Sequence, residues 1–334
     1  SFILTSGNVR FNNSGSVDVQ AGIMSFSAGG SNSGAIQFTS GTSMTFNDSY
    51  THSGTSVLTG AGTLNLNGGN QSFPAGAQVS AGVLNLGGAS VSFATPKTFA
   101  SVTFSAGTLT GAGDVTVTGT LNWTGTGIMG GSGKTIITAT AVLNLNTPAA
   151  QYYLRRILQN DGATFWTAGG ISMDGGRLDN NGTFTANAAT TLTCTGYNPS
   201  GIASDSDFNN AGTFLKQGTG MASFILTSGN VRFNNSGSVD IRQGTLNLSA
   251  GGFFDFSPPS VLRSQPGTTL SLPGLNVGGS TTNAPQYFPK GRLLFAGGGN
   301  SQLEVMSRDL GNVPVGYETN FAYATLELGG GANL

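Results

Sequence analysis

Cysteine, histidine and charged residues are scarce in this 334-residue chain. The one cysteine, Cys194, excludes an internal disulfide framework, and its Thr-Leu-Thr-Cys-Thr context predicts a small core residue. Charged residues make up 8% of the chain, and the net charge of -1 comes with no basic run, which excludes the electrostatic footprint of a nucleic-acid-binding protein. No run of roughly 18 or more apolar residues occurs, so no membrane-spanning helix is predicted.

Glycine and hydrophobic residues are plentiful instead. The chain has 54 glycines, and 37% of its residues are hydrophobic, including 21 phenylalanines. Low charge with much Gly and Ser is typical of disordered linkers, but so much apolar material is unfavourable in water. The apolar residues also alternate with polar ones, as a folded strand requires. The composition therefore predicts a folded, all-β protein.

A long duplication runs through the chain. Ser1–Asp18 recurs identically at Ser223–Asp240, an offset of 222 residues from residue 1 to residue 223, and a weaker match extends it to 1–30 and 223–252. Residue 1 therefore lies inside a repeat, and no secretory signal begins the chain. We expect a segment of a longer protein whose export signal lies elsewhere.

Two shorter motifs repeat inside this unit. The first, Gly-[Thr/Val]-Leu-Asn-[Leu/Trp] with one variant, has its central leucines at Leu64, Leu84, Leu121 and Leu143. The second, Asn-Asn-(x)-Gly-[Thr/Ser]-[Phe/Val], occurs at Asn12–Val17, Asn180–Phe184, Asn209–Phe214 and Asn234–Val239. The leucine spacings fit one or two units of about 20 residues, the pattern of stacked coils made of short strands.

The sequence thus predicts a parallel β-helix, or β-solenoid, of about 20-residue coils over residues 1–252. At this coil length the whole chain would hold about 15 coils. Asparagines in successive coils would form hydrogen-bonded ladders, and Gly and Asn at the corners would take positive φ. The residues expected to point inward include Leu64, Leu66, Val83, Val115 and Val117.

Two regions depart from the regular pattern. Ala149–Leu158 has helical spacing, so residues 149–170 are expected to form either a lateral insertion or a bent coil. Residues 253–334 contain seven of the 11 prolines, and strands are expected there at 292–295, 302–306 and 323–328. This less regular β region is either a continuation of the solenoid or a cap.

The repeats resemble those of large secreted bacterial proteins of the filamentous-haemagglutinin and autotransporter-passenger type. The resemblance covers roughly residues 1–252 and rests on Phe11–Val19, Gly60–Leu66, Gly111–Val117 and Phe208–Phe214; Leu303–Leu328 looks like a C-terminal region that accompanies such repeats. It implies a right-handed parallel β-helix, secretion to the cell surface or beyond, and adhesive or structural duty. It brings no catalytic residues.

Few residues are candidates for chemistry. A Ser-His-Asp triad would have to use His52, with Asp48 as its partner, against the simpler reading of a loop histidine. Asp205 and Asp207 share one side of a strand and could act as acid and base or bind calcium, although solvated loop aspartates are the alternative. Asp174 with Asp179 is a second carboxylate pair.

Other candidates have a structural alternative as well. Tyr152, Tyr153 and Trp166 could form a sugar-stacking strip, against packing in the core. Arg155 and Arg156, near Asp161, are expected to be an exposed pair rather than an anion site. Gly131–Thr135 only superficially resembles a phosphate loop, because it runs into a strand pattern rather than a helix.

We therefore expect a non-catalytic structural or adhesive module with no cofactor. One expected partner is a further copy of itself, stacked head-to-tail or laterally, because uncapped solenoid ends expose unpaired strand edges. Surface glycans or other cells are the other expected partners. Two alternatives are a carbohydrate-binding or polysaccharide-cleaving β-helix and, ranked below it, an ice-binding solenoid with a flat threonine face.

Overall fold

The structure is a computed structural model. Side chains are described for residues 10–196, 206–225, 227, 229, 231–248 and 268–270, and further strands are described as backbone at 2–3, 256–264, 269–272, 291–295, 299–300, 302–305, 324–328 and 332–333. Every element in this described part is a β-strand. It accordingly offers no helix of the length and apolarity needed to cross a membrane.

The chain is an all-β parallel β-solenoid of about 11 turns with coils of about 20 residues, which confirms the predicted fold class. It divides into two compact units, the first made of Ser1–Leu145 with Ala150–Gly162 and the second of Asn146–Ala149 with Ala163–Leu334. Some coils are longer than 20 residues, since the equivalent positions Asn180, Asn210 and Asn235 are 30 and 25 residues apart.

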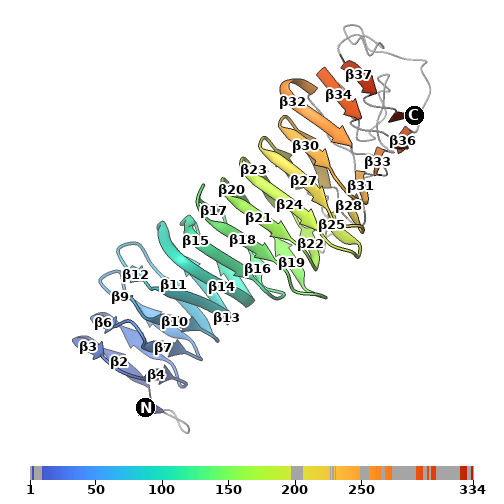
Figure 1. The fold of residues 1–334 in the computed structure, drawn as a ribbon. Coiled ribbons are helices and arrows are strands. Elements are labelled where there is room, and N and C mark those ends of the chain that lie inside the picture. The colour runs from blue at the N-terminus through green and yellow to red at the C-terminus, as the bar shows by residue number, and fades with distance from the viewer. Residues whose placement is uncertain are drawn as a thin grey trace. The chain divides into compact units, whose positions relative to one another are not determined.

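In the first unit, strands of successive coils pair in parallel to form three columns (Figure 1). The first column contains β2 (Phe11–Asn13), β5 (Gly30–Asn32), β8 (Tyr50–His52), β11 (Asn70–Phe73), β16 (Ile128–Met129) and β19 (Gln151–Leu154). The second contains β3 (Ser16–Val19), β6 (Ala35–Phe38), β9 (Val57–Gly60) and β12 (Gln78–Ser80), and further along β17 (Lys134–Ile137) and β20 (Ile157–Asn160). The third contains β1 (Phe2–Ile3), β4 (Ile23–Phe26), β7 (Ser43–Phe46), β10 (Thr63–Leu66) and β18 (Val142–Leu145). Three long strands, β13 (Val83–Phe93), β14 (Lys97–Thr110) and β15 (Val115–Trp123), bend between columns: β13 and β15 serve two columns each, and β14 serves all three.

The second unit is built in the same way. One column contains β21 (Ala163–Trp166), β24 (Thr183–Asn187), β27 (Thr213–Gln217), β30 (Ser238–Ile241), β32 (Phe256–Ser264), β34 (Gly291–Phe295) and β37 (Ala324–Leu328). Another contains β22 (Gly170–Met173), β25 (Leu192–Gly196), β28 (Met221–Ile225), β31 (Thr245–Leu248), β33 (Thr269–Leu272) and β36 (Gln302–Val305). The third contains β23 (Arg177–Asn180), β26 (Ser206–Asn210) and β29 (Val231–Asn235), and β35 (Gly299–Asn300) pairs with β38 (Ala332–Asn333).

The leucine motif forms one continuous inward column. Leu64 pairs in register with Leu84, and Leu121 with Leu143. Val102 occupies the position between Leu84 and Leu121, so the long gap in the motif is two coils, one of which carries valine. All five side chains are buried. Because β-branched and γ-branched residues fill the same inward position, the motif search missed this coil.

Inward and outward positions alternate with period two along the strands. Leu66, Val115 and Val117 are buried as expected. Val83, however, is only half-buried, because it pairs with Thr63 on the outer face and its neighbour Leu84 points inward. The prediction that Val83 faces the core was wrong by one residue, and in a strand such a shift moves a side chain to the other face.

The segment 149–170 contains regular strands rather than a lateral insertion. Residues 151–166 alternate between partly exposed and buried positions through β19, β20 and β21. The helical spacing of Ala149–Leu158 was therefore misleading. In a run where nearly every residue is large, the same residues fit both periods, and pairing with neighbouring coils favours the strand.

Glycines at the corners serve two different purposes. Positive φ occurs at several glycines, including Gly22 and Gly244. Ala149 is the only residue other than glycine with positive φ in the described ranges. The expectation that corner asparagines take positive φ was wrong. A second set of glycines allows close packing, because a Cβ on Gly237 would overlap the carbonyl oxygen of Gly212 in the preceding coil.

Candidate functional site

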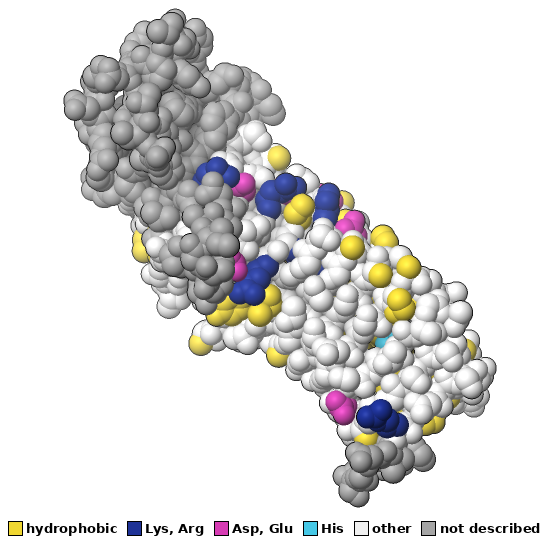
Figure 2. All heavy atoms as spheres, turned by 180° about the vertical axis from the view of Figure 1, so that it is seen from behind, with side chains coloured by type: hydrophobic (Ala, Val, Ile, Leu, Met, Phe, Trp, Pro, Cys, Tyr) yellow, Lys and Arg dark blue, Asp and Glu magenta, His cyan; other side chains and the backbone are white. Residues whose placement is uncertain are grey.

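The second unit carries a cluster of charged and amide side chains on the outer side of β23, β26 and β29. The strand register aligns Arg177 with Asp207 and Asp207 with Arg232, and it aligns Asp179 with Asn209 and Asn209 with Asn234. Side chains at positions two apart face the same side of a strand, so these residues form two adjacent columns. On the face of the molecule drawn in Figure 2, charged side chains are sparse and most of the surface is uncharged.

Asp207 is held by donors from the following coil. Arg232 donates from Nε to Oδ1 at 2.7 Å and from Nη2 to Oδ2 at 3.1 Å, a bidentate pair, and Asn234 Nδ2 donates to Oδ1 at 3.1 Å. A carboxylate engaged in this way has few free lone pairs for a cation. Asp205, the other calcium candidate, lies outside the described residues. Among those that are described, no group of three or more His, Cys, Asp or Glu side chains is placed to hold a metal ion.

Asp179, a predicted member of a carboxylate pair, is also held. Arg177 Nη2 lies 2.8 Å from Asp179 Oδ2, and Asn209 Nδ2 donates to Asp179 Oδ1 at 2.9 Å. Its proposed partner Asp174 lies in the turn after β22. The structure thus brings Asp179 and Asp207 onto neighbouring strands, and their oxygens bind arginine and amide groups. Asn209 links Asp179 to the next coil, and Arg232 and Asn234 link Asp207 to the coil after that.

A buried asparagine ladder runs beside these columns. Asn180 Nδ2 donates to Asn210 Oδ1 at 2.7 Å, and Asn210 Nδ2 donates to Asn235 Oδ1 at 2.6 Å. All three side chains are buried, and those of Asn180 and Asn210 also donate to a backbone carbonyl of the next coil. The first unit has the same arrangement, where Asn13 Nδ2 donates to Asn32 Oδ1 at 2.9 Å. The predicted asparagine ladders are confirmed, and they satisfy amides that burial would otherwise penalise.

His52 lies in strand β8 and points into the core, so the expectation of a loop histidine was wrong. Its ring stacks on Phe73 at a centroid distance of 4.2 Å, and Nε2 lies 3.4 Å from Gln71 Oε1. Burial lowers the pKa of His52 to about 4. Asp48 is exposed and accepts a hydrogen bond from the Ser49 amide. His52 is therefore a neutral ring in an aromatic stack.

Two buried cations hold corner carbonyls. Arg156, expected on the surface, is buried and donates to the carbonyls of Gly133 at 2.7 Å and Lys134 at 2.8 Å; Arg155 beside it is exposed. Burial lowers the pKa of Arg156 to about 10, against the opposing field of Asp114. The alternation of 151–166 would have placed Arg156 inward, since it follows Leu154 by two residues.

Lys216 has the same role, and the sequence analysis did not identify it. Its side chain is buried, and Nζ donates to the carbonyl oxygens of Gln217 at 2.9 Å, Gly218 at 2.7 Å and Gln243 at 3.1 Å. Desolvation lowers its pKa to about 8. The signal in the sequence was its position two residues after the inward Phe214.

The aromatic candidates for sugar stacking are mostly in the core. Tyr152 and Trp166 are fully buried, and Trp166 Nε1 donates to the Gly169 carbonyl at 3.0 Å. Tyr153 is half-buried on the outer side. Two of the three rings therefore have no face to offer a sugar, and the core alternative holds for them.

Cys194 and the glycine-rich segment before Ile136 are structural as predicted. Cys194 is fully buried with its Sγ 3.6 Å from Met173 Sδ, and burial raises the pKa of its thiol. A neutral, buried thiol is a poor nucleophile. Lys134–Ile137 is strand β17, so the resemblance to a phosphate loop is false.

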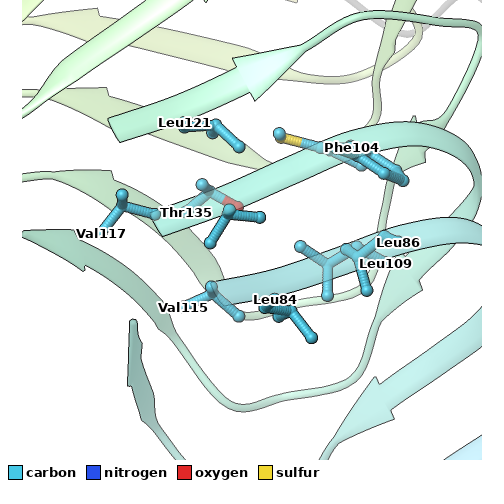
Figure 3. A pocket seen from close by; sticks show the side chains of 10 residues that line it. Leu84, Leu86, Phe104, Leu109, Val115, Val117, Leu121 and Thr135 are labelled. Carbon is cyan, nitrogen blue, oxygen red and sulfur yellow. The ribbon is translucent and has the colours of Figure 1, made fainter. Parts of the chain in front are cut away.

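The first unit encloses a small apolar cavity of about 10 Å³ (Figure 3). Leucine and valine side chains with Phe104, Met129 and Thr135 line it. A space of this size holds one water at most, and an apolar lining favours an empty void. It is a packing defect where the bent strands β13, β14 and β15 meet, rather than a ligand site.

A shallow polar groove of about 430 Å³ lies where the four-stranded sheet β12-β9-β6-β3 ends. Lys97 Nζ crosses it and donates to the Ala77 carbonyl at 2.8 Å and to Thr95 Oγ1 at 3.1 Å. Burial lowers the pKa of Lys97. The ammonium group is thus used to join two coils across the interruption in the sheet.

No known protein family, curated protein sequence or solved structure matches this chain. The class that the coordinates define is the parallel β-solenoid.

Proposed function

We propose that this chain is a non-catalytic structural or adhesive module of a secreted or cell-surface bacterial protein. In this proposal the stacked coils act as a stiff scaffold, and further copies stack on it through strand edges to build an extracellular filament. Surface glycans are a second expected partner. The bacterial source and the extracellular location follow from the resemblance of the repeats to secreted solenoid proteins.

The observation that carries the proposal is how the reactive side chains are used. Asp207 is engaged by Arg232 and Asn234 of the next coil, and Asp179 by Arg177 and Asn209. His52 is buried in an aromatic stack. Side chains that could perform acid-base or nucleophilic chemistry instead stabilise the stacking of coils.

Electron microscopy of the purified chain over a concentration series tests the filament. We expect fibres with a regular axial repeat, because a head-to-tail contact that does not close propagates. Monodisperse monomers at high concentration, measured by sedimentation, would overturn the self-assembly part. A glycan array would then show whether the module binds carbohydrate.

A polysaccharide-degradation assay tests the non-catalytic part, with Asp207→Asn and Asp179→Asn as the informative variants. We expect no turnover by the unmodified chain. Turnover that disappears in either variant would show that the charged columns are a catalytic site. Arg177→Gln is the matched control, because it breaks an ion pair and leaves both carboxylates in place.

A further inference from the structure

One strand column of the first unit is interrupted between two described coils. The sheet β3-β6-β9-β12 ends at β12, and the next strand of that column is the start of β14, at Lys97–Phe99. Residues Lys97–Phe99 pair with β15 on their following side. In the part of the chain that the structure describes, no strand pairing joins β12 to these residues across the interruption. Two strand edges therefore face each other inside the solenoid.

The backbone groups that point into this opening can be assigned. In a paired strand, the N–H and C=O groups of successive residues point alternately to the two neighbouring strands. The Gln78 amide donates to a carbonyl of the preceding coil at 2.9 Å, so the backbone groups of Val79 point to the following side. The Lys97 amide donates to a carbonyl of the following coil at 2.8 Å, so those of Thr98 point back. Each edge therefore directs one donor and one acceptor into the opening.

The opening is too narrow for a peptide that pairs with both edges. The two strands that flank an inserted strand lie about 9.6 Å apart, which is twice the ordinary strand spacing. Some Cα atoms of β12 lie within 8 Å of Cα atoms of β14. The donors and acceptors of Val79 and Thr98 are thus placed for a ligand smaller than a strand.

The opening lies in the polar groove of about 430 Å³, a volume within the range of about 300–1,000 Å³ that is usual for small-molecule sites. Its lining includes the hydroxyl and amide side chains of Thr59, Gln78, Ser80, Thr95 and Thr98. Those of Gln78, Ser80 and Thr98 are exposed. A lining with so many hydrogen-bonding groups suits a ligand that itself carries many hydroxyl groups.

Lys97 supplies the charge of this groove. No acidic residue lines the groove, and Lys97 is the only charged residue between Asp48 and Asp114 in the sequence. An ammonium group has three N–H donors, and Lys97 uses two of them on the Ala77 carbonyl and Thr95 Oγ1. The third N–H remains for a ligand. A cation without an acidic side chain in the same groove favours a ligand of negative charge.

We propose that this groove binds an acidic sugar residue of a polysaccharide. The sugar carboxylate accepts a hydrogen bond from the third N–H of Lys97. The sugar hydroxyls bond the backbone groups of Val79 and Thr98 and the side chains of Gln78 and Ser80. This inference deepens the proposed function and rests on its expectation that surface glycans are a partner.

Titration of the full chain with tri-galacturonic acid, followed by NMR, tests the site. We expect chemical-shift changes at the Val79 and Thr98 amides. The methyl ester of the same trimer is the matched ligand, because it keeps the hydroxyl groups and loses the negative charge. Its dissociation constant should be higher by about tenfold or more, since a charge-assisted hydrogen bond is lost.

Lys97→Gln is the informative variant, and Lys134→Gln is its matched control. The glutamine amide keeps a donor for the Ala77 carbonyl and removes the charge. Lys134 lies on β17 of the same column and does not line the groove. We expect Lys97→Gln to weaken binding of the acidic trimer by about tenfold and to leave binding of the ester unchanged, whereas Lys134→Gln should change neither.

Equal binding of the acid and the ester by the unmodified chain would overturn the site. Absence of shift changes at Val79 and Thr98 would overturn it as well, and this result does not depend on any variant. The glycan array detects binding anywhere on the chain. Array binding that Lys97→Gln retains in full would overturn the groove and leave the glycan partner in place, so the two proposals can fail separately.

Discussion

The two copies of the 18-residue repeat have one sequence and two degrees of burial. Phe233 is 0% exposed in the second copy, whereas its equivalent Phe11 is half-buried in the first. The asparagine of each corner nevertheless makes the same hydrogen bond to the glycine two residues later. Local conformation is therefore a property of the repeat itself, and burial and ion pairing depend on the neighbouring coil.

The largest expected difference in stability between the two copies comes from truncating the equivalent residues Phe233 and Phe11. Phe233→Ala should lower the free energy of unfolding by about 4 kcal/mol, because it deletes a fully buried ring that contacts Phe208, Phe214 and Phe224. Phe11→Ala should cost less than half as much. Denaturant unfolding of both variants measures the difference. Equal losses in the free energy of unfolding would contradict the claim that burial under the preceding coil decides how much the ring stabilises the fold.

The two copies should also differ in the change of stability caused by adding a methyl group at the equivalent residues Gly237 and Gly15. Gly237→Ala should destabilise the protein by about 3 kcal/mol, because its Cβ would overlap the carbonyl of Gly212. Gly15→Ala has open space and should change stability by less than about 0.5 kcal/mol. Thermal unfolding of both variants tests this. A large loss in Gly15→Ala would mean that the first copy is already covered.

Acid should weaken the unit that contains the first copy, because it holds His52, the one histidine of the chain. The folded-state pKa of His52 is about 4, below its ordinary value of 6.5, so the unfolded state binds a proton that the folded state excludes. Stability is full above about pH 6.5 and falls as the pH drops toward 4. The expected loss between pH 7 and pH 5 is about 2 kcal/mol.

Hydrogen exchange at the two pH values, corrected for the intrinsic rates, measures this loss in each unit separately. His52→Phe is the control, since a phenyl ring keeps the stack on Phe73 and removes the titrating group. If the variant keeps the same pH dependence, another group is responsible.

The smallest expected difference in stability is between variants of the equivalent residues Arg232 and Arg10. Arg232→Ala should destabilise the protein by about 1 kcal/mol, because the side chains of Arg232 and Asp207 are 37% and 24% exposed and solvent screens their pair. Arg10→Ala should be neutral within about 0.5 kcal/mol. A double-mutant cycle with Asp207→Ala measures the coupling energy of the pair. A coupling energy of zero would show that the ion pair does not contribute to stability.

The repeat motifs predicted the coil period, the leucine column and the asparagine ladders, because those features recur in several successive coils. They did not predict which of two adjacent apolar residues points inward, as Val83 and Leu84 show. Both fit a strand, and the pairing of Val83 with Thr63 decides the face. The buried Arg156 was also missed, because the carbonyls that it binds come from the preceding coils.

The sequence by itself determined the fold class, since alternation, corner glycines and a period near 20 residues are local properties that no other arrangement satisfies as well. The candidate site depended on tertiary structure. Whether an aspartate is a free acid or half of an ion pair, as at Asp207, depends on the residue that the next coil places beside it. That residue lies 25 positions away in the chain, a distance fixed by the length of one coil and not by any local motif.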